Sequence, residues 1–183
     1  LRNPVLSKIG PRMLRKALSW HLPLNGVMKA TMFKHFCGGE SMQECIPLME
    51  KLARYNVMTI LDYSSEGLKN EGAAEKSFNE FLQNIEFSGR QPHTPFAVFK
   101  PSALTSVALL EKVSRDEVLT LEEQRKYNDL YNRFDRICAT AAAAKVPVMV
   151  DAEESWTQKA VDDLALQMME KYNREAIYVM NTF

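Results

Sequence analysis

The sequence feature that most constrains the fold is a repeated alternation of short apolar, β-rich runs and amphipathic helical stretches. The clearest run, Val-Pro-Val-Met-Val at residues 146–150, ends in Asp151, and a helical pattern follows directly. Comparable runs occupy residues 27–36, 57–61, 96–99 and 176–180. Hairpin turn signals are missing between them, so successive runs are expected to pair in parallel through right-handed crossovers. The sequence therefore predicts an α/β protein with a parallel sheet of about five strands.

Helical spacing of apolar residues fills the intervals between these runs. The predicted helices cover approximately residues 41–55, 71–86, 105–113, 120–144 and 155–172. Two of them open with the spacing of a capping box, Ser41 with Glu44 and Thr120 with Glu123. Pro47 falls inside the first helix and is expected to displace its start or to bend it.

Charge and cysteine content exclude several classes of protein. The chain carries 23 basic and 23 acidic residues, which argues against an electrostatic nucleic-acid binder. Its apolar runs are shorter than the roughly 18–20 residues that span a bilayer, and its start lacks the pattern of a secretory signal. Cys37, Cys45 and Cys138 are odd in number and lack metal-ligand spacing, so neither disulfides nor a structural metal is expected. A reducing, intracellular compartment is the simplest interpretation.

Two kinds of parallel α/β architecture compete, and the missing motifs separate them. The turn Cys37-Gly38-Gly39-Glu40 matches neither the dinucleotide fingerprint nor a phosphate-binding Walker loop. This favours a (β/α)8 TIM-type barrel, of which the chain holds about the first five β/α units. Barrels need about 250 residues, so we expect a fragment. Residues 28–183 are then the N-terminal portion of the barrel, and residues 1–27 a lead-in helical segment that packs on it.

The chemistry-bearing residues gather where the runs end. Parallel strands meet at one rim of a barrel, and this rim would collect Glu40, Asp62, Glu66, Lys100, Asp151, Glu153 and Asn181. A single cation among several acids suits perturbed pKa values and zwitterionic ligands. Each residue taken alone has a structural explanation, such as a helix cap or a solvated loop acid. Glu154 in particular fits the acidic N-terminus of a helix.

The residues alone leave several chemistries open. Lys100 could form a Schiff base with a carbonyl substrate, as in aldolase-like barrels. Asp151 and Glu153 could bind a hard metal ion, although no clear ligand spacing supports it. Lys100 could instead be a fixed positive charge for a substrate carboxylate or a cofactor. A non-catalytic half-barrel is a further alternative, disfavoured by the concentration of charge at the strand ends.

A family resemblance chooses among these chemistries. Five segments occur in order: Lys34–Glu40, Leu61–Gly67, Phe99–Leu104, Val150–Glu154 and Met180–Phe183. Together they resemble the successive strand-end motifs of the proline dehydrogenase family, over about residues 29–183. The resemblance implies an FAD enzyme on a (β/α)8 barrel that oxidises L-proline to Δ1-pyrroline-5-carboxylate, the first step of proline catabolism. It also implies that the electrons pass to a membrane quinone.

The resemblance also implies roles for individual residues. Lys100 is similar to the lysine at the proline and flavin site, and Asp62 to the acid on the substrate side. Asp151 matches the acid beside the flavin ring, and Asn181 the amide position that contacts the isoalloxazine. We interpret Glu153, Glu66 and Glu40 as supporting residues. In this chemistry the protein orients the two rings and tunes the electronics of the flavin.

The family's later strands, with the arginines that hold the proline carboxylate and most contacts to the FAD phosphates and adenine, would lie beyond Phe183. The polypeptide alone is therefore expected to bind FAD poorly and to show no turnover. Its exposed sheet edge should favour homo-oligomers or pairing with a complementing C-terminal half. The expected location is the bacterial cytoplasm with peripheral attachment to the inner membrane; the mitochondrial inner membrane is the alternative.

Overall fold

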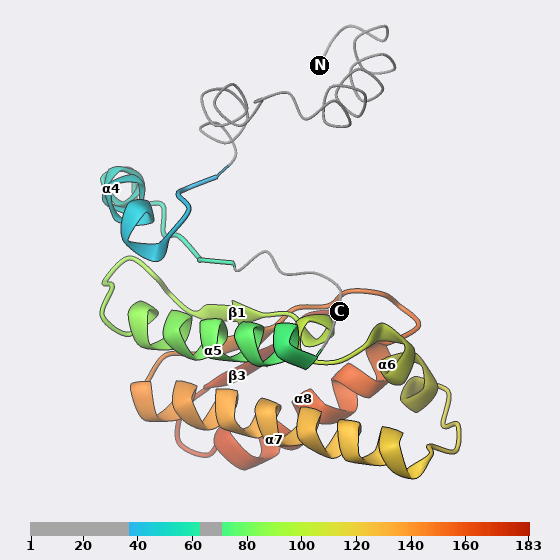
Figure 1. Cartoon of the computed structure of the whole chain (residues 1–183). Helices are drawn as coiled ribbons and strands as arrows, with labels where there is room; N and C mark the ends of the chain where they lie inside the picture. The colour runs from blue at the N-terminus through green and yellow to red at the C-terminus, as the bar shows by residue number, and fades with distance from the viewer. Residues whose placement is uncertain (1–36, 63–70) are drawn as a thin grey trace, which may run out of the picture. The chain divides into compact units, whose positions relative to one another are not determined.

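The computed structural model describes residues 37–62 and 71–183 (Figure 1). The chain divides into two units, one up to Leu48 and one from Met49 onward. The predicted first strand, residues 27–36, and the lead-in segment, residues 1–27, lie outside the described residues.

A three-stranded parallel sheet forms the centre of the second unit. Its strands β1 (Ala97–Phe99), β2 (Val148–Val150) and β3 (Val179–Asn181) lie in the order β1-β2-β3. The register pairs Phe99 with Val150, and Val150 with Asn181. The α/β class and the parallel pairing of three predicted strands are thus confirmed. The last strand lies further along the chain than predicted and includes Asn181.

The predicted strand over residues 57–61 is not formed. The backbone of this segment finds partners outside the sheet, because the Thr59 N–H donates to the His93 carbonyl at 3.0 Å. Val57, Met58 and Ile60 are 47%, 53% and 44% exposed, so their apolar pattern does not mark a buried strand. Of the four predicted strands that fall in the described residues, three are therefore formed.

Helices pack against the sheet, close to their predicted positions in the sequence (Figure 1). The second unit contains α5 (Glu71–Ser88), the short 3₁₀ turn η2 (Pro101–Ala103), α6 (Val107–Ser114), α7 (Leu121–Ala144) and α8 (Gln158–Tyr172). The capping box of Thr120 and Glu123 is present at the start of α7. The helix α8 begins later than predicted, because Glu154–Thr157 forms a turn closed by the Thr157 N–H on the Glu154 carbonyl.

The remaining helix, α4 (Met42–Ala53), answers one of the two expectations for Pro47, the displaced start. Its start is not displaced: the helix begins directly after Ser41 and runs through Pro47. The Ser41 Oγ accepts from the Glu44 N–H at 3.3 Å, as a capping residue does. The reciprocal bond differs from a capping box, because the Glu44 carboxylate accepts from the N–H of Glu40, not from that of Ser41.

The core lies between the sheet and its helices. α7 contacts both α5 and α8, while α5 lies against β1 and α8 against β3. Phe99 is fully buried, with its ring centroid 4.9 Å from that of Phe134 in an edge-to-face arrangement and 5.8 Å from that of Phe81. Side chains of this size each stabilise the fold by about 1.5–3 kcal/mol when buried. Along β1 and β2, the residue between two buried ones is half-buried, so the sheet presents a second, more open face.

Candidate active site

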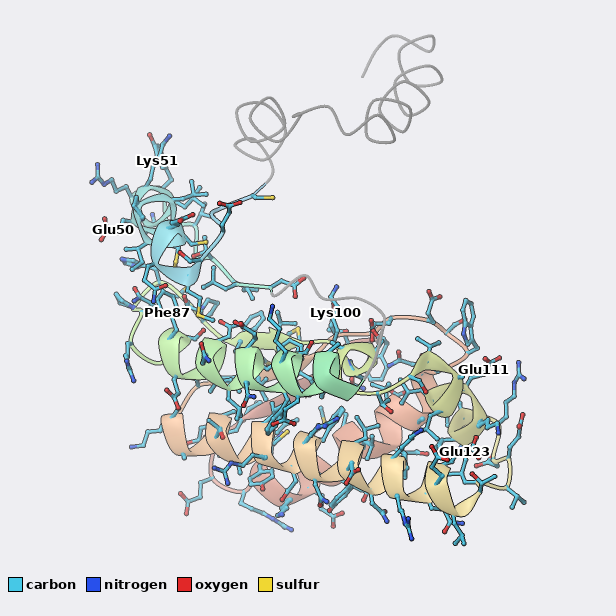
Figure 2. The ribbon with its side chains drawn as sticks, in the orientation of Figure 1. Glu50, Lys51, Phe87, Lys100, Glu111 and Glu123 are labelled. Atoms are coloured by element: carbon cyan, nitrogen blue, oxygen red, sulfur yellow. The ribbon has the colours of Figure 1, made fainter. Side chains whose placement is uncertain are left out.

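Lys100 lies between two carboxylates at the carboxyl ends of the strands. Its Nζ is 3.3 Å from an Asp151 oxygen and 3.6 Å from an Asp62 oxygen. The lysine side chain is 17% exposed, whereas those of Asp151 and Asp62 are 36% and 46% exposed. Figure 2 labels Lys100 near the end of β1. Three predicted site residues, distant in sequence, are therefore brought together as predicted.

The strand ends explain why Lys100 and Asp151 meet. The Asp151 N–H donates to the Phe99 carbonyl at 3.0 Å and continues the ladder one residue past β2. Successive residues of a strand point to opposite faces of the sheet. Lys100 directly follows buried Phe99 and Asp151 directly follows buried Val150, so the side chains of Lys100 and Asp151 point to the opposite face. Their side chains are thereby placed on the more open side of the sheet.

Asp62 reaches the same place from outside the ladder. The Leu61 carbonyl, directly before it, accepts from the Asn84 side chain of α5 at 2.8 Å, which ties this segment to the helix. One lysine and two aspartates have a formal charge of −1 when all are ionised. Such a cluster can bind a cationic group beside its carboxylates and an anionic group beside its ammonium, which suits a zwitterion.

Glu153 lies beside the cluster and bonds to the turn that follows Lys100. One carboxylate oxygen accepts from the Ser102 N–H at 2.9 Å, and the other from the Ser102 hydroxyl at 2.5 Å. Ser102 is 6% exposed. The sequence did not indicate that Ser102 binds Glu153, since a serine in a short turn carries no distinctive signal.

Asn181 has a different environment from Lys100. Its register with Val150 places it in the row that faces the helices, and its Nδ2 donates to the Asp162 carboxylate of α8 at 2.7 Å. The Gln158 amide donates to the same oxygen at 2.7 Å. Among the described residues, the buried Asn181 Oδ1 has no hydrogen-bond partner. Asn181 is thus oriented by its bond to α8, and its Oδ1 is an unused acceptor among the described residues.

The other two supporting residues remain predictions. Glu66 lies outside the described residues. Glu40 belongs to the unit that ends at Leu48, where its N–H donates to Glu44. In the two described stretches, no group of three or more His, Cys, Asp or Glu side chains could hold a metal ion. No helix in those stretches has the length and apolar character needed to cross a membrane.

The fold and the position of the cluster are those of an α/β enzyme. The second unit is a parallel β/α structure that gathers a lysine and acids at the carboxyl ends of its strands, where α/β enzymes build their sites. A sequence model of the proline dehydrogenase family matches residues 45–183, and the chain therefore belongs to that family.

Individual relatives agree with this assignment. The chain is 35% identical over 147 residues to the carbapenem antibiotics biosynthesis protein CarD of Pectobacterium carotovorum, covering 80% of this chain and 39% of that protein. It is 27% identical over 198 aligned positions to the mitochondrial proline dehydrogenase 1 of Dictyostelium discoideum, covering 88% of this chain and 35% of the relative. The chain thus spans little more than a third of the length of these relatives.

A solved structure shows the same fold. The proline utilization A protein of Bdellovibrio bacteriovorus, inactivated by N-propargylglycine, superposes with a TM-score of 0.58 at 19% identity. The match covers 80% of this chain and 16% of that one. At this identity the likeness concerns the fold alone.

Proposed function

We propose that the protein oxidises L-proline to Δ1-pyrroline-5-carboxylate with FAD as its cofactor. The observation that carries the proposal is the position of Lys100 between Asp62 and Asp151 at the strand ends, in a chain of the proline dehydrogenase family. Proline is a zwitterion, with a cationic ring nitrogen and a carboxylate. The cluster offers the opposite charge to each of these groups.

The proposed architecture is a (β/α)8 barrel, with residues 28–183 as its N-terminal portion. Three consecutive parallel strands joined by helices support it, as does the more open sheet face that carries Lys100 and Asp151. In a barrel that face would line the interior, and the strand ends would form the floor of the site. The lead-in role of residues 1–27 belongs to the same proposal.

Proline dehydrogenases are in general flavoproteins, and the described residues fit the ring system of a flavin better than its phosphates. Lys100 supplies a hydrogen-bond donor, and Asn181 an amide whose Oδ1 is unused among the described residues. Asp151 adds a carboxylate beside them. We propose that Lys100 and Asp151 hold the isoalloxazine on the more open face of the sheet. Asn181 lies in the helix-facing row, so its proposed contact with the ring requires its amide to turn away from Asp162. When bound, FAD supplies the acceptor for the hydride that leaves the proline ring.

The residues of this chain would then orient and polarise the substrate. Lys100 offers a fixed ammonium whose three donors can hold an anionic group or a ring heteroatom. Asp62, the more exposed of the two partner acids, can stabilise the ring-nitrogen cation and accept its proton as the ring is oxidised. Glu153 supports the turn beside Lys100, and we propose supporting roles for Glu40 and Glu66 as well.

We propose that a membrane quinone accepts the electrons. We also propose that the protein is peripherally attached to the bacterial inner membrane, with the mitochondrial inner membrane as the alternative. Several relatives are named as mitochondrial, including those of Dictyostelium discoideum and Schizosaccharomyces pombe, and they support the alternative location. We also propose that the 183-residue polypeptide itself does not turn over proline.

The test is the replacement of Lys100 by methionine in the full-length protein. Loss of the ammonium should lower kcat/KM for proline, followed with an artificial electron acceptor, by at least about a hundredfold, as expected for a group that orients and polarises the reacting ring. The matched control is Lys126→Met, since Lys126 forms an exposed pair with Glu122 on α7. If Lys100→Met and Lys126→Met oxidised proline equally well, the site assignment would be wrong.

A trapping experiment distinguishes the proposed proline oxidation from the alternative in which Lys100 forms a Schiff base. Two carboxylates beside the Lys100 Nζ stabilise its charged form, whereas a Schiff-base nucleophile must be a neutral amine. Borohydride treatment in the presence of a carbonyl substrate should therefore leave Lys100 without an adduct in the intact mass. An adduct on Lys100 would favour the aldolase-like chemistry.

A further inference from the structure

Two strand ends are each held by a side chain that comes from beyond the end of the next strand. At the end of β1, Ser102 is held by Glu153, which follows β2 and accepts from both the N–H and the hydroxyl of the serine. Ser102 stands two residues after Lys100 and is 6% exposed. The turn that leaves Lys100 is therefore bonded to the neighbouring strand end.

The second strand end repeats the arrangement one strand further along. The Thr182 Oγ1, directly after β3, accepts from the Ala152 N–H at 2.6 Å and donates to the Val150 carbonyl at 3.3 Å. The Thr182 N–H donates to the same carbonyl at 3.2 Å. These groups lie on either side of Asp151. One threonine thus holds the backbone both before and after the aspartate.

We propose that Glu153 and Thr182 are positioning residues, which we call the strand-end clamps, and that they set the placement of Lys100 and Asp151. The inference rests on the proposed function. Each strand has only three residues, and the ladder continues past the ends of β2 and β3 by single backbone bonds, from Asp151 to Phe99 and from Thr182 to Val150. The clamps extend the order of the sheet further, by side-chain bonds in addition to these backbone bonds.

The flexibility of the Lys100 side chain is the reason why its backbone must be held in place. A lysine has a long stem with several rotatable bonds, so the position of its Nζ depends on the direction in which the backbone presents it. The Lys100 Nζ lies 3.3 Å from Asp151, and a displacement of about 1 Å at such a site can cost about a hundredfold in rate. Bonds to the backbone at Ser102 and around Asp151 restrict that displacement.

A purely structural role makes a different prediction. Lys100 provides no side-chain cap for η2, so the role of Glu153 could be limited to satisfying the buried N–H of Ser102 in that turn. In that case its loss would lower the melting temperature or the flavin content and leave the kinetics of the loaded enzyme unchanged. The melting temperature and the flavin content of each variant are therefore measured beside its kinetics.

The first test compares Thr182→Val with Thr182→Ser in the full-length, flavin-loaded protein. Valine keeps the shape of threonine but removes both hydrogen bonds of the Oγ1, whereas serine retains them. We expect Thr182→Val to lower kcat by about tenfold to a hundredfold, with a smaller change in KM, and Thr182→Ser to stay within about threefold of wild type. Equal kinetics for Thr182→Val and wild type would overturn the proposal.

The second test uses adjacent glutamates as a matched pair. Glu153→Gln leaves one acceptor oxygen for the two donors of Ser102, while Glu154→Gln changes an exposed neighbour. The midpoint potential of the bound flavin should shift in Glu153→Gln and stay at the wild-type value in Glu154→Gln. This readout remains informative if Thr182→Val fails to fold. An unchanged potential in Glu153→Gln, together with unchanged kcat, contradicts the inference.

The two proposals fail in different ways. If Lys100→Met is fully active, the site assignment is wrong, and so is the positioning role of the strand-end clamps, which depends on it. If Lys100→Met is inactive while Glu153→Gln and Thr182→Val behave as wild type, only the clamps are wrong.

Discussion

The three cysteines show how position decides the chemistry of a single residue. Cys138 lies on α7 with no exposed surface, and burial, followed by the charge of Asp135, raises the pKa of its thiol to about 12. Burial and then the charge of Glu44 also raise the pKa of Cys45. Cys37 is exposed. Because the thiolate is the reactive form, we expect a disulfide reagent at pH 8 to modify Cys37 first and Cys138 only after denaturation.

Counting the thiols that react in the native and the denatured protein tests this order. Cys37→Ser should remove the fast phase and leave the reaction of Cys138 in the denatured protein unchanged. Rapid modification of Cys138 without loss of structure would show that α7 opens more easily than its packing suggests.

The start of α7 allows a prediction at the level of the element. The Lys112 side chain and the N–H of Thr120 both bond to Glu123, and they lower the pKa of its carboxyl from 4.5 to about 2 (Figure 2). The folded state thus favours the charged carboxylate, so this contribution to stability is present above pH 4.5 and is lost as the pH falls toward 2.

Glu123→Gln isolates the charge, because glutamine at this position can still accept the capping bond from the Thr120 N–H. The melting temperature of Glu123→Gln should be lower than that of wild type at pH 6, and the difference should shrink as the pH falls below about 4.5. Glu170→Gln, at an exposed position of α8, serves as the control. A difference that stays constant with pH would exclude the ionic contribution.

At the scale of the whole molecule, β3 is an edge strand of the sheet in the residues that the structure describes. In the part of the chain that the structure describes, β3 pairs only with β2, and Ile177 beside it is 65% exposed. An apolar sheet edge is a template for association with another chain. We expect the 183-residue polypeptide to associate in a concentration-dependent manner and Ile177→Lys to reduce this association.

Light scattering after gel filtration measures the association directly. Leu166→Lys is the matched control, since Leu166 is 61% exposed on α8 and lies away from the strands in sequence. Equal effects of the two substitutions would mean that general surface hydrophobicity, not the edge of the sheet, drives association.

Much of this structure could be predicted from local patterns. Helix positions followed from the spacing of apolar residues, and the start of α7 followed from the capping position Thr120. The meeting of Lys100 with Asp151 followed from the geometry of parallel strands, since their carboxyl ends lie at one edge. The helices and their capping positions depend on residues close together in the sequence. The meeting of Lys100 with Asp151 depends only on the shared direction of parallel strands.

Other features depended on the tertiary structure. Residues 57–61 have the composition of a strand, yet their backbone bonds to the loop at His93, because pairing is decided by available partners and not by propensity. The alternation of faces at β3 brings Asn181 to Asp162 of α8, a contact that no spacing in the sequence indicates. The bonds of Glu153 to Ser102 and of Thr182 to Ala152 span 51 and 30 residues.

The sequence by itself thus determined the α/β class, most helices and the family, because each depends on local periodicity or on motifs in a fixed order. Only the tertiary structure decided which strand ends are bonded to each other and which residues hold Lys100 and Asp151 in place. The physical reason is that a hydrogen bond depends on the positions of two groups in space, and residues far apart in the chain acquire those positions only when the whole sheet has formed.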